Sequence, residues 1–373
     1  MENVNNIPGR PKRIIIAGGG TGGHIFPAIA IANALRKSSP TIELLFVGAK
    51  GKMEMEKVPQ AGYTIKGLNI AGFNRSSILK NLSLPFKLIK SFFQVKEIFS
   101  SFKPDAVVGV GGYSTFPVLK YAQGKHIPTF IHESNSFAGK SNILLGKKAT
   151  KIFVASEGME KFFPKEKIMV TGNPVRKIIS ESTVSRAQGI KFFGLDESKK
   201  TILAVGGSLG ARSINEVMLS HLMDLHALNI QLIWQTGKNN ASRYIMSGKM
   251  HKKHVWVDEF IQEIDKAYAA ADIVISRAGA MSVSEMCVAG KPTVFVPYPF
   301  ASEDHQTENA MHLIRKDAGA IVKDSEASTK LFGVVTDILF DENKLKTFKE
   351  NISKLAVTNA NEVVAEEILK TIK

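Results

Sequence analysis

The stretch that decides the fold is Ile14-Ile15-Ile16-Ala17-Gly18-Gly19-Gly20-Thr21-Gly22-Gly23-His24. Its β-branched start predicts a buried strand, and the five glycines that follow predict a loop. Pro27 and the alanine-rich stretch 28–35 then predict a helix. Glycine lets backbone N–H groups approach an anion closely, and a helix N-terminus adds partial positive charge. The stretch therefore predicts chemistry beside a phosphate, with His24 as the group best suited to take a proton.

Length and composition favour a two-domain α/β protein. The 373 residues exceed what one hydrophobic core usually holds. The single cysteine, Cys287, excludes an internal disulfide and indicates a reducing compartment. Residues 1–13 lack the apolar core of a secretory signal. The sequence also has no run of about 18 apolar residues, so we expect no transmembrane helix.

The formal net charge of +15 predicts an anionic partner. Nucleic acid, an acidic membrane surface and phosphorylated substrates all carry the required charge. The lysines are not interleaved with aromatic residues in a recognisable nucleic-acid-binding module, so we expect no nucleic-acid partner.

Strand and helix signals alternate along the whole chain. Helix-length amphipathic segments, among them 208–227 and 282–289, separate short apolar runs. This alternation predicts doubly wound parallel sheets, with the loops at the strands' carboxyl ends gathered at one edge. The expected strands are 13–17, 43–47, 106–110, 129–132 and 151–154, followed by 201–205, 231–235, 255–257, 273–276 and 293–296.

A weak internal repeat supports two domains of this kind. The stretch 201–212 repeats the strand, glycine loop and helix of the opening stretch. Between the two series, the connection 170–176 contains Gly172 and Pro174 and is suited to a hinge. We expect one domain to span 1–173 and the other 174–355, with a final helix over about 356–373.

The opening loop also fits a dinucleotide fingerprint, Gly18-x-Gly20-x-x-Gly23. An NAD-binding loop of this type requires an acidic residue at the end of the next strand. That strand ends at residues 46–50 without an acid, which disfavours a dehydrogenase. A purely structural glycine loop remains the other alternative.

The segment Ser276–Glu285 again joins a strand to a helix through small residues. Its N–H groups would face a diphosphate, and Glu285 would accept hydrogen bonds from the two hydroxyls of a ribose. The spacing equally fits a capping box, with Ser282 as cap and Glu285 as its partner. A third segment, 297–310, places hydroxyl, amide and imidazole groups after a strand, which suits a sugar or an ordinary polar loop.

Seven motifs together resemble the MurG family, the bacterial UDP-GlcNAc:lipid I N-acetylglucosaminyltransferases of peptidoglycan synthesis. The resemblance covers almost the whole chain. It implies the GT-B fold, which is two Rossmann-like domains with an interdomain cleft, and a final helix that packs on the N-terminal domain. The motifs are Gly19–His24, Gly109–Tyr113, His132–Asn135, Thr171–Arg176, Gly206–Arg212, Ser276–Glu285 and His305-Gln306.

The resemblance also implies the roles of individual residues. The donor would lie mainly on the C-terminal domain, and the N-terminal domain would bind the acceptor and associate with the membrane. Arg176 would contribute charge at the diphosphate, the backbone of Ile261 would read the uracil edge, and Gln306 would bind GlcNAc hydroxyls. The full set of substrate-binding residues is Thr21, Gly22, Gly23, Asn135, Arg176, Ser208, Ile261, Ala280, Met281, Ser282, Val283, Ser284, Glu285 and Gln306.

The implied reaction is attack by the C4 hydroxyl of the MurNAc of lipid I on the anomeric carbon of GlcNAc, with inversion. His24 is the expected catalytic base, and His132 and Glu133 are the alternatives. The chain has no Asp-x-Asp pair, so we expect neither a metal nor a cofactor. Leu209 and Ser134 stand where relatives often carry glutamine. An epimerase acting on UDP-GlcNAc is the alternative reaction on the same fold.

Residues 75–103 carry two apolar stripes with the spacing of a helix. We expect Leu88, Phe92, Val95, Phe99 and Phe102 to face the core. The second stripe, Leu82, Phe86, Ile89 and Phe93, is accompanied by Arg75, Lys80, Lys87, Lys90, Lys96 and Lys103. It predicts a helix lying on an anionic membrane surface, or else a second buried face. With the resemblance, this implies a peripheral protein at the cytoplasmic face of the bacterial inner membrane, with cell-wall synthesis proteins as further partners.

Overall fold

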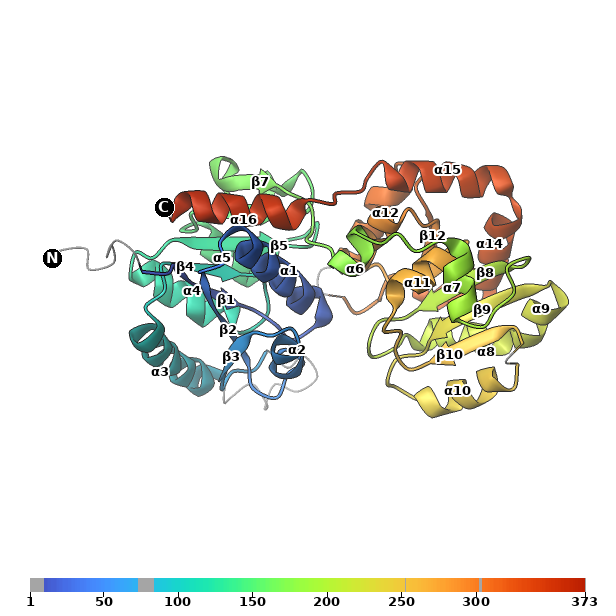
Figure 1. The fold of residues 1–373 in the computed structure, drawn as a ribbon, viewed down its shortest axis with the longest axis horizontal. Coiled ribbons are helices and arrows are strands. Elements are labelled where there is room, and N and C mark those ends of the chain that lie inside the picture. The colour runs from blue at the N-terminus through green and yellow to red at the C-terminus, as the bar shows by residue number, and fades with distance from the viewer. Residues whose placement is uncertain (1–9, 73–83, 252, 302–303, 373) are drawn as a thin grey trace. The chain divides into compact units, whose positions relative to one another are not determined.

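The computed structural model describes residues 10–72, 84–251, 253–301 and 304–372. The chain divides into two compact units (Figure 1). The first unit comprises Met1–Pro174 and Asn359–Lys373, and the second comprises Val175–Thr358. Each unit is a parallel sheet covered by helices on both faces.

Within the described residues, the first unit contains a seven-stranded sheet in the order β3-β2-β1-β4-β5-β6-β7. The strand order reverses at β1, whose Ile15 pairs with Leu45 on one side and Val107 on the other. Ligands of doubly wound sheets bind beyond the strands' carboxyl ends at such a switch point. The strands are β1 (Arg13–Ala17), β2 (Glu43–Ala49), β3 (Thr64–Leu68), β4 (Ala106–Gly109), β5 (Thr129–Glu133), β6 (Lys151–Val154) and β7 (Ile168–Val170).

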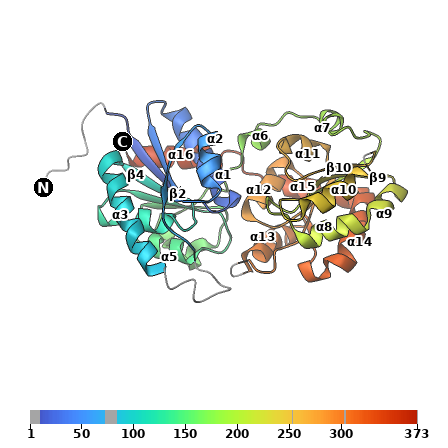
Figure 2. The ribbon, with the colours of Figure 1, turned by 90° about the horizontal axis from the view of Figure 1, so that it is seen from below.

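Helices cover both faces of this sheet (Figure 2). One face packs against α1 (Gly22–Ser38), α2 (Glu54–Gln60) and the C-terminal helix α16 (Ala360–Thr371). The other packs against α3 (Leu84–Phe102), α4 (Thr115–Gly124) and α5 (Lys140–Gly146). The final helix α16 lies against α1, and both contribute apolar side chains to the same core.

The second unit repeats this architecture with a six-stranded sheet among its described residues, in the order β10-β9-β8-β11-β12-β13. The order reverses at β8, which the second glycine loop follows. The strands are β8 (Lys200–Val205), β9 (Ile230–Gln235), β10 (Val255–Asp258), β11 (Ile273–Ser276), β12 (Thr293–Phe295) and β13 (Ala320–Ile321).

Two hydrophobic cores lie on the two faces of this second sheet. Trp234 of β9 belongs to one of these cores and Phe295 of β12 to the other, so the sheet is covered on both faces. The helices are α6 (Lys177–Ser180), α7 (Arg186–Phe192), α8 (Arg212–Ser220), α9 (Leu222–Ala227), α10 (Ala241–Lys249), α11 (Ile264–Ala270), α12 (Ala280–Ala289), α13 (His305–Ile314), α14 (Ala327–Phe340) and α15 (Glu342–Ser353).

The ten strands expected from the sequence are all present, and the prediction of doubly wound parallel sheets is confirmed. The single helix expected over 208–227 is wrong. Gly207 and Gly210 adopt positive φ angles of 85°, so the helix starts only at Arg212, and the helical run is interrupted again at His221. Helix α1 begins at Gly22, ahead of Pro27, which lies inside it.

Candidate active site

Three N–H groups of the first glycine loop are bound inside their own unit. The N–H of Gly18 donates to the carbonyl of Val47 over 3.2 Å, and that of Gly19 donates to the carbonyl of Gly111 over 3.2 Å. The N–H of Gly20 donates to Glu54 Oε2 over 2.8 Å. These three groups therefore shape the loop and do not face a ligand.

The next residues open helix α1 and present its N-terminus. Thr21 is the residue before the helix, with an extended backbone, and Gly22 and Gly23 form the first turn. N–H groups at this position have no partner within the helix, because the carbonyls four residues before them lie outside it. The N–H groups of His24 and Ile25 already bond to the carbonyl of Thr21. The anion-binding capacity of the loop therefore resides in Gly22 and Gly23.

His24 is fixed by the same loop. Its Nδ1 lies 3.1 Å from the carbonyl oxygen of Gly19 and 3.4 Å from Thr21 Oγ1. The other side of the ring lies against Gly111, where a Cβ atom would come within 2.7 Å of Nε2. Because a carbonyl oxygen only accepts, Nδ1 is the donor and carries the proton, and in the neutral ring Nε2 is then the basic nitrogen.

His132, one of the two alternative bases, lies at the end of β5 and is fully buried. Its Nδ1 lies 3.3 Å from the hydroxyl oxygen of Ser134. The backbone carbonyl of Ser134 in turn accepts a hydrogen bond from Asn173 Nδ2. Burial, with a smaller contribution from the nearby His24, lowers the pKa of His132 to about 4, against an opposing backbone hydrogen bond at Gly172. His132 is therefore neutral at physiological pH.

Glu133, the other alternative base, is occupied by hydrogen bonds. Its Oε1 accepts from the backbone N–H of Asn135 over 3.1 Å and from Asn135 Nδ2 over 3.2 Å. Its Oε2 accepts from the N–H of Gly139 over 3.0 Å and from Asn142 Nδ2 over 2.8 Å. The carboxylate thus holds the loop that carries the predicted substrate contact Asn135.

In the second unit, the N-terminus of α12 faces the carboxyl edge of the sheet. The cap is Gly279, with extended backbone and no side-chain hydrogen bond, so the capping box of Ser282 and Glu285 is wrong. The first-turn N–H groups of Ala280, Met281 and Ser282 are therefore those without a helical partner. The N–H group of the next residue, Val283, donates to the carbonyl of Gly279. The side chain of Val283 belongs to the hydrophobic core.

Ser284, Ser208 and Leu209 also belong to the motifs of this unit. Ser284 is half-buried on the second turn of α12. Ser208 is half-buried in the loop between β8 and α8, and its carbonyl accepts from the N–H of Lys238. Leu209, one of the two departures from the family pattern, is exposed in the same loop.

Glu285 is buried and forms a bidentate ion pair with Arg176 rather than a capping interaction. Arg176 Nε donates to Oε1 over 2.9 Å and Nη2 donates to Oε2 over 3.0 Å. The hydroxyl of Tyr268 donates to Oε2 over 3.1 Å. Burial opposes the charge on Arg176, but the carboxylate of Glu285 outweighs it and raises the pKa of Arg176.

Two further predicted contacts are already engaged within the unit. The N–H of Ile261 donates to Gln235 Oε1 over 3.0 Å. The side-chain oxygen of Gln306 accepts from the N–H of Tyr298 over 2.9 Å. This leaves the carbonyl of Ile261 and the amide NH₂ of Gln306 as the groups able to meet a ligand.

Arg277 was not assigned a role from the sequence, although it lies within the motif Ser276–Glu285. Its Nη1 donates to the carbonyls of Val296 and Pro297 over 3.0 and 3.2 Å and forms an ion pair with Asp324. Arg277 therefore ties the loop after β12 to the loop that opens α12. Only the folded sheet brings these segments together.

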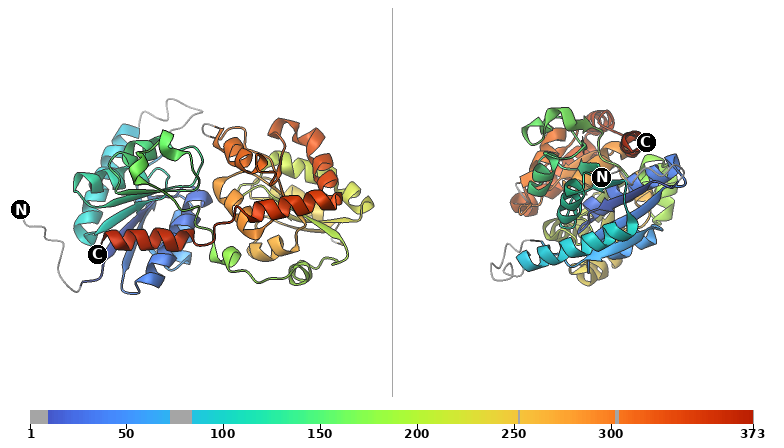
Figure 3. Two further views of the ribbon diagram at one scale, coloured as in Figure 1. Left: turned by 90° about the horizontal axis from the view of Figure 1, so that it is seen from above. Right: turned by 90° about the vertical axis from the view of Figure 1, so that its left-hand side faces the viewer.

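The second apolar stripe of α3 is exposed, so the alternative of two buried stripes is wrong. Phe86, Ile89 and Phe93 are 76%, 57% and 69% exposed, whereas Val95 and Phe99 of the first stripe are buried. Figure 3 shows α3 (cyan) at the periphery of its unit. The accompanying Lys87, Lys90, Lys96 and Lys103 are exposed, while Leu82, Arg75 and Lys80 lie outside the described residues.

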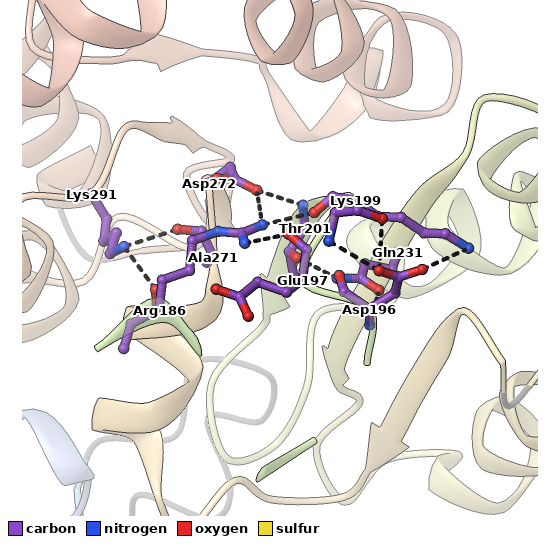
Figure 4. Close-up of polar contacts among 11 residues, drawn as sticks. Arg186, Asp196, Glu197, Lys199, Thr201, Gln231, Ala271, Asp272 and Lys291 are labelled. Atoms are coloured by element: carbon purple, nitrogen blue, oxygen red, sulfur yellow. Dashed lines mark hydrogen bonds and ion pairs between the residues drawn. The ribbon is translucent and has the colours of Figure 1, made fainter. Parts of the chain in front are cut away.

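A separate polar network occupies the opposite, amino-terminal edge of the second sheet (Figure 4). Asp272 Oδ2 accepts from Arg186 Nη2 over 3.2 Å and from the N–H of Thr201 over 2.7 Å. Lys291 Nζ donates to the carbonyl of Ala271 over 2.9 Å. Burial lowers the pKa of Lys291 to about 8. These contacts join strands and helices away from the glycine loop and are structural.

Within the ranges that the structure describes, no helix is long and apolar enough to cross a membrane. No group of three or more His, Cys, Asp or Glu side chains in the same ranges is arranged to hold a metal ion.

Comparisons with known proteins agree with this architecture. Residues 14–154 match the glycosyltransferase family 28 N-terminal domain, and residues 201–364 match the corresponding C-terminal domain. A crystal structure of MurG from Acinetobacter baumannii has a TM-score of 0.76 and 29% identity, covering 96% of this chain and 100% of that one. A UDP-GlcNAc 2-epimerase from Neisseria meningitidis has a TM-score of 0.67 at 16% identity, and covers 96% of this chain and 100% of its own, which shows a shared fold only.

Curated relatives are much more similar in sequence. A protein of Phocaeicola vulgatus is 51% identical over 96% of both chains. One of Flavobacterium psychrophilum is 48% identical over 97% of this chain and 98% of its own. Both are named UDP-N-acetylglucosamine–N-acetylmuramyl-(pentapeptide) pyrophosphoryl-undecaprenol N-acetylglucosamine transferase. The resemblance found in the motifs and the GT-B fold are confirmed, and the chain belongs to this family of glycosyltransferases.

Proposed function

We propose that this enzyme transfers GlcNAc from UDP-GlcNAc to the C4 hydroxyl of MurNAc in an undecaprenyl-pyrophosphoryl acceptor. Membership of a family of N-acetylglucosamine transferases supports the reaction class. The donor and acceptor are those in the names of the relatives. The choice of the C4 hydroxyl and the inversion of configuration follow from the resemblance to the MurG family.

The observation that carries the mechanism is the hydrogen bond between His24 Nδ1 and the carbonyl of Gly19. It assigns the proton to Nδ1 and leaves Nε2 as the basic nitrogen. The two alternative bases are less suited. Glu133 already accepts four hydrogen bonds, and His132 is fully buried with a pKa of about 4.

In the proposed step, His24 Nε2 takes the proton of the acceptor C4 hydroxyl as its oxygen attacks the anomeric carbon of GlcNAc. The bond between that carbon and the diphosphate oxygen breaks on the opposite face, and its electron pair leaves with UDP. The configuration at the anomeric carbon is inverted by this single displacement. General-base catalysis of this kind contributes about 10²–10⁴-fold to the rate.

The second unit is proposed to hold the donor and stabilise the departing UDP. The N-terminus of α12, at Ala280, Met281 and Ser282, offers N–H groups and partial positive charge to the diphosphate, and the Ser208 hydroxyl adds a further donor. In the first unit, Gly22 and Gly23 supply N–H groups of the same kind.

Recognition of the nucleoside and sugar follows from the groups left available. Glu285 has about one acceptor site left for a ribose hydroxyl, because a carboxylate has about four such sites and three donors occupy three of them here. Arg176 then acts by orienting Glu285, and its contribution at the diphosphate is through overall charge. The carbonyl of Ile261 accepts from uracil, and the Gln306 NH₂ and Asn135 contact the GlcNAc moiety and phosphate.

We further propose that α3 binds an anionic membrane surface, where the lipid-linked acceptor resides. The exposed Phe86, Ile89 and Phe93 supply apolar contact, and the neighbouring lysines each contribute about 1 kcal/mol near an anionic leaflet. The proposed location is peripheral, at the cytoplasmic face of the bacterial inner membrane. Other cell-wall synthesis proteins are proposed as further partners there.

The decisive experiment compares UDP release from UDP-GlcNAc with and without the lipid-linked MurNAc acceptor. Release that depends on the acceptor, together with a disaccharide product, is the expected result. Conversion of UDP-GlcNAc without acceptor would instead indicate an epimerase and would contradict the proposal.

A further inference from the structure

Glu54 is a buried carboxylate that sequence analysis did not connect with the site. It is the first residue of α2, yet only 1% of its surface is exposed. Its Oε1 accepts from the N–H of Ala49 over 2.9 Å, at the end of β2. Its Oε2 accepts from the N–H of Gly20 over 2.8 Å. Glu54 therefore joins the end of a neighbouring strand to the loop that precedes His24.

The glycines around Glu54 are required by this carboxylate. A Cβ atom on Gly19 would lie 2.3 Å from its carboxyl carbon, and one on Gly48 would lie 2.5 Å from its Cγ. Only residues without a side chain leave room for Glu54 at these two positions. Part of the glycine richness of the opening stretch thus accommodates Glu54, not a phosphate.

The peptide between Gly19 and Gly20 connects Glu54 to His24. Its N–H donates to Glu54, and its C=O, that of Gly19, accepts from His24 Nδ1. The φ angles of Gly19 and Gly20 are 146° and 91°. A peptide unit between two such glycines is free of the Cβ clashes that prevent rotation elsewhere. The hydrogen bond to Glu54 therefore helps to fix the direction of this C=O.

We infer that Glu54 is a positioning residue for His24, acting through the Gly19–Gly20 peptide. The carboxylate holds the peptide N–H inside the unit, so that the C=O on the other side points at Nδ1. This contact keeps the proton on Nδ1 and Nε2 basic. Hydrogen bonds in such a chain also polarise one another, which strengthens the contact to Nδ1–H. The inference rests on the proposed role of His24 as the base.

The test is the variant Glu54→Gln, which keeps the shape of the side chain but cannot accept both N–H groups. We expect kcat to fall about 10- to 100-fold, a part of the ~10²–10⁴-fold that general-base catalysis supplies. The KM for UDP-GlcNAc should change less than about twofold, because the proposed donor contacts lie mainly in the second unit. The control is Glu56→Gln on the same helix, whose exposed side chain accepts hydrogen bonds from Lys57 and Gln60; kcat should be unchanged.

A double-mutant cycle separates positioning from a general loss of structure. If Glu54 acts through His24, adding Glu54→Gln to His24→Ala should cost no further activity. The same 10- to 100-fold loss in both backgrounds would overturn the inference.

A spectroscopic measurement in the unmodified enzyme keeps the inference testable even where the variant folds poorly. The ¹⁵N shifts of the His24 ring report which nitrogen carries the proton. We expect the Nδ1–H form in the wild type and a mixture in Glu54→Gln. The Nε2–H form in the wild type would overturn the inference. Full turnover by His24→Ala would instead refute the base role alone, since the tautomer measurement does not depend on catalysis.

Discussion

Arg176 and Glu285 are 109 positions apart in the sequence, yet they form a bidentate ion pair with N–O distances of 2.9 and 3.0 Å. Arg176 directly precedes α6, and Glu285 lies on the second turn of α12. The pair fixes the direction of the carboxylate that is proposed to bind ribose. A guanidinium is the side chain whose geometry matches both carboxylate oxygens at once.

Replacement of Arg176 by lysine should therefore weaken donor binding. Lysine keeps the charge but loses the second hydrogen bond, so Glu285 is no longer held in one orientation. We expect the KM for UDP-GlcNAc to rise about tenfold, which corresponds to about 1.4 kcal/mol. Steady-state kinetics with varied UDP-GlcNAc measures this change.

The matched control is Arg243→Lys. Arg243 also forms a bidentate pair, with Glu216, but that pair is exposed to solvent and outside the proposed site. The KM of the Arg243→Lys variant for UDP-GlcNAc should be unchanged. Equal effects of both substitutions would show that Arg176 contributes only to general stability.

Replacement of His24 by alanine should separate donor binding from turnover. UDP-GlcNAc affinity should be retained, because the proposed donor contacts lie mainly in the second unit. Acceptor-dependent UDP release should fall by ~10²–10⁴-fold, the usual share of a general base. Calorimetric titration of UDP-GlcNAc and a turnover assay measure the two quantities. Near-native turnover would remove His24 from the role of base.

The strands could be predicted where apolar runs are continuous, because β1, β4 and β8 are buried on both faces. Three strands were not predicted. β3 alternates exposed and half-buried residues and includes Lys66 and Gly67, while β7 and β13 are edge strands of three and two residues. Such short edges carry too little apolar pattern to be recognised.

The position of the two glycine loops, each between a strand and a helix, could likewise be predicted from their composition. The hydrogen-bond partners that lie far away in the sequence could not be predicted. Glu54 and Gly20 are 34 positions apart, and the sequence around Glu54 resembles an ordinary helix start. Arg277 and Asp324 are 47 apart. These contacts depend on which loops the sheet order brings together, and a local pattern does not contain that information.

The buried His132 should make stability depend on pH. Its pKa in the folded enzyme is about 4, below the ordinary value of 6.5, because burial disfavours the charged ring. Between these two values the unfolded chain binds the proton more readily, so stability is lost as the pH falls from about 6.5 towards 4. The expected loss from this residue between pH 7.5 and pH 5 is about 2 kcal/mol at most.

Denaturant unfolding of the wild type and of His132→Asn at the two pH values measures this contribution. The variant is expected to be less stable at pH 7.5 but to lose less stability on acidification. An identical loss in both proteins would show that other groups account for the acid sensitivity.

The exposed face of α3 should determine membrane binding. The double variant Phe86→Ser/Phe93→Ser removes two side chains that are 76% and 69% exposed, so the fold should be retained. Each phenylalanine contributes about 1.5–3 kcal/mol when buried in an apolar phase. Their loss should lower partitioning onto vesicles that contain anionic phospholipid by at least about 100-fold. Sedimentation of the protein with vesicles measures the bound fraction.

The control for this experiment is Met246→Ser/Met250→Ser in the second unit, where the side chains are 71% and 82% exposed. These methionines have similar exposure but lie at the end of α10, outside the proposed membrane surface. Vesicle binding should be unaffected by their replacement. High salt should weaken binding of the wild type, because the lysines of α3 act through screened charge. Binding that survives the loss of Phe86 and Phe93 unchanged would assign the membrane contact to another surface.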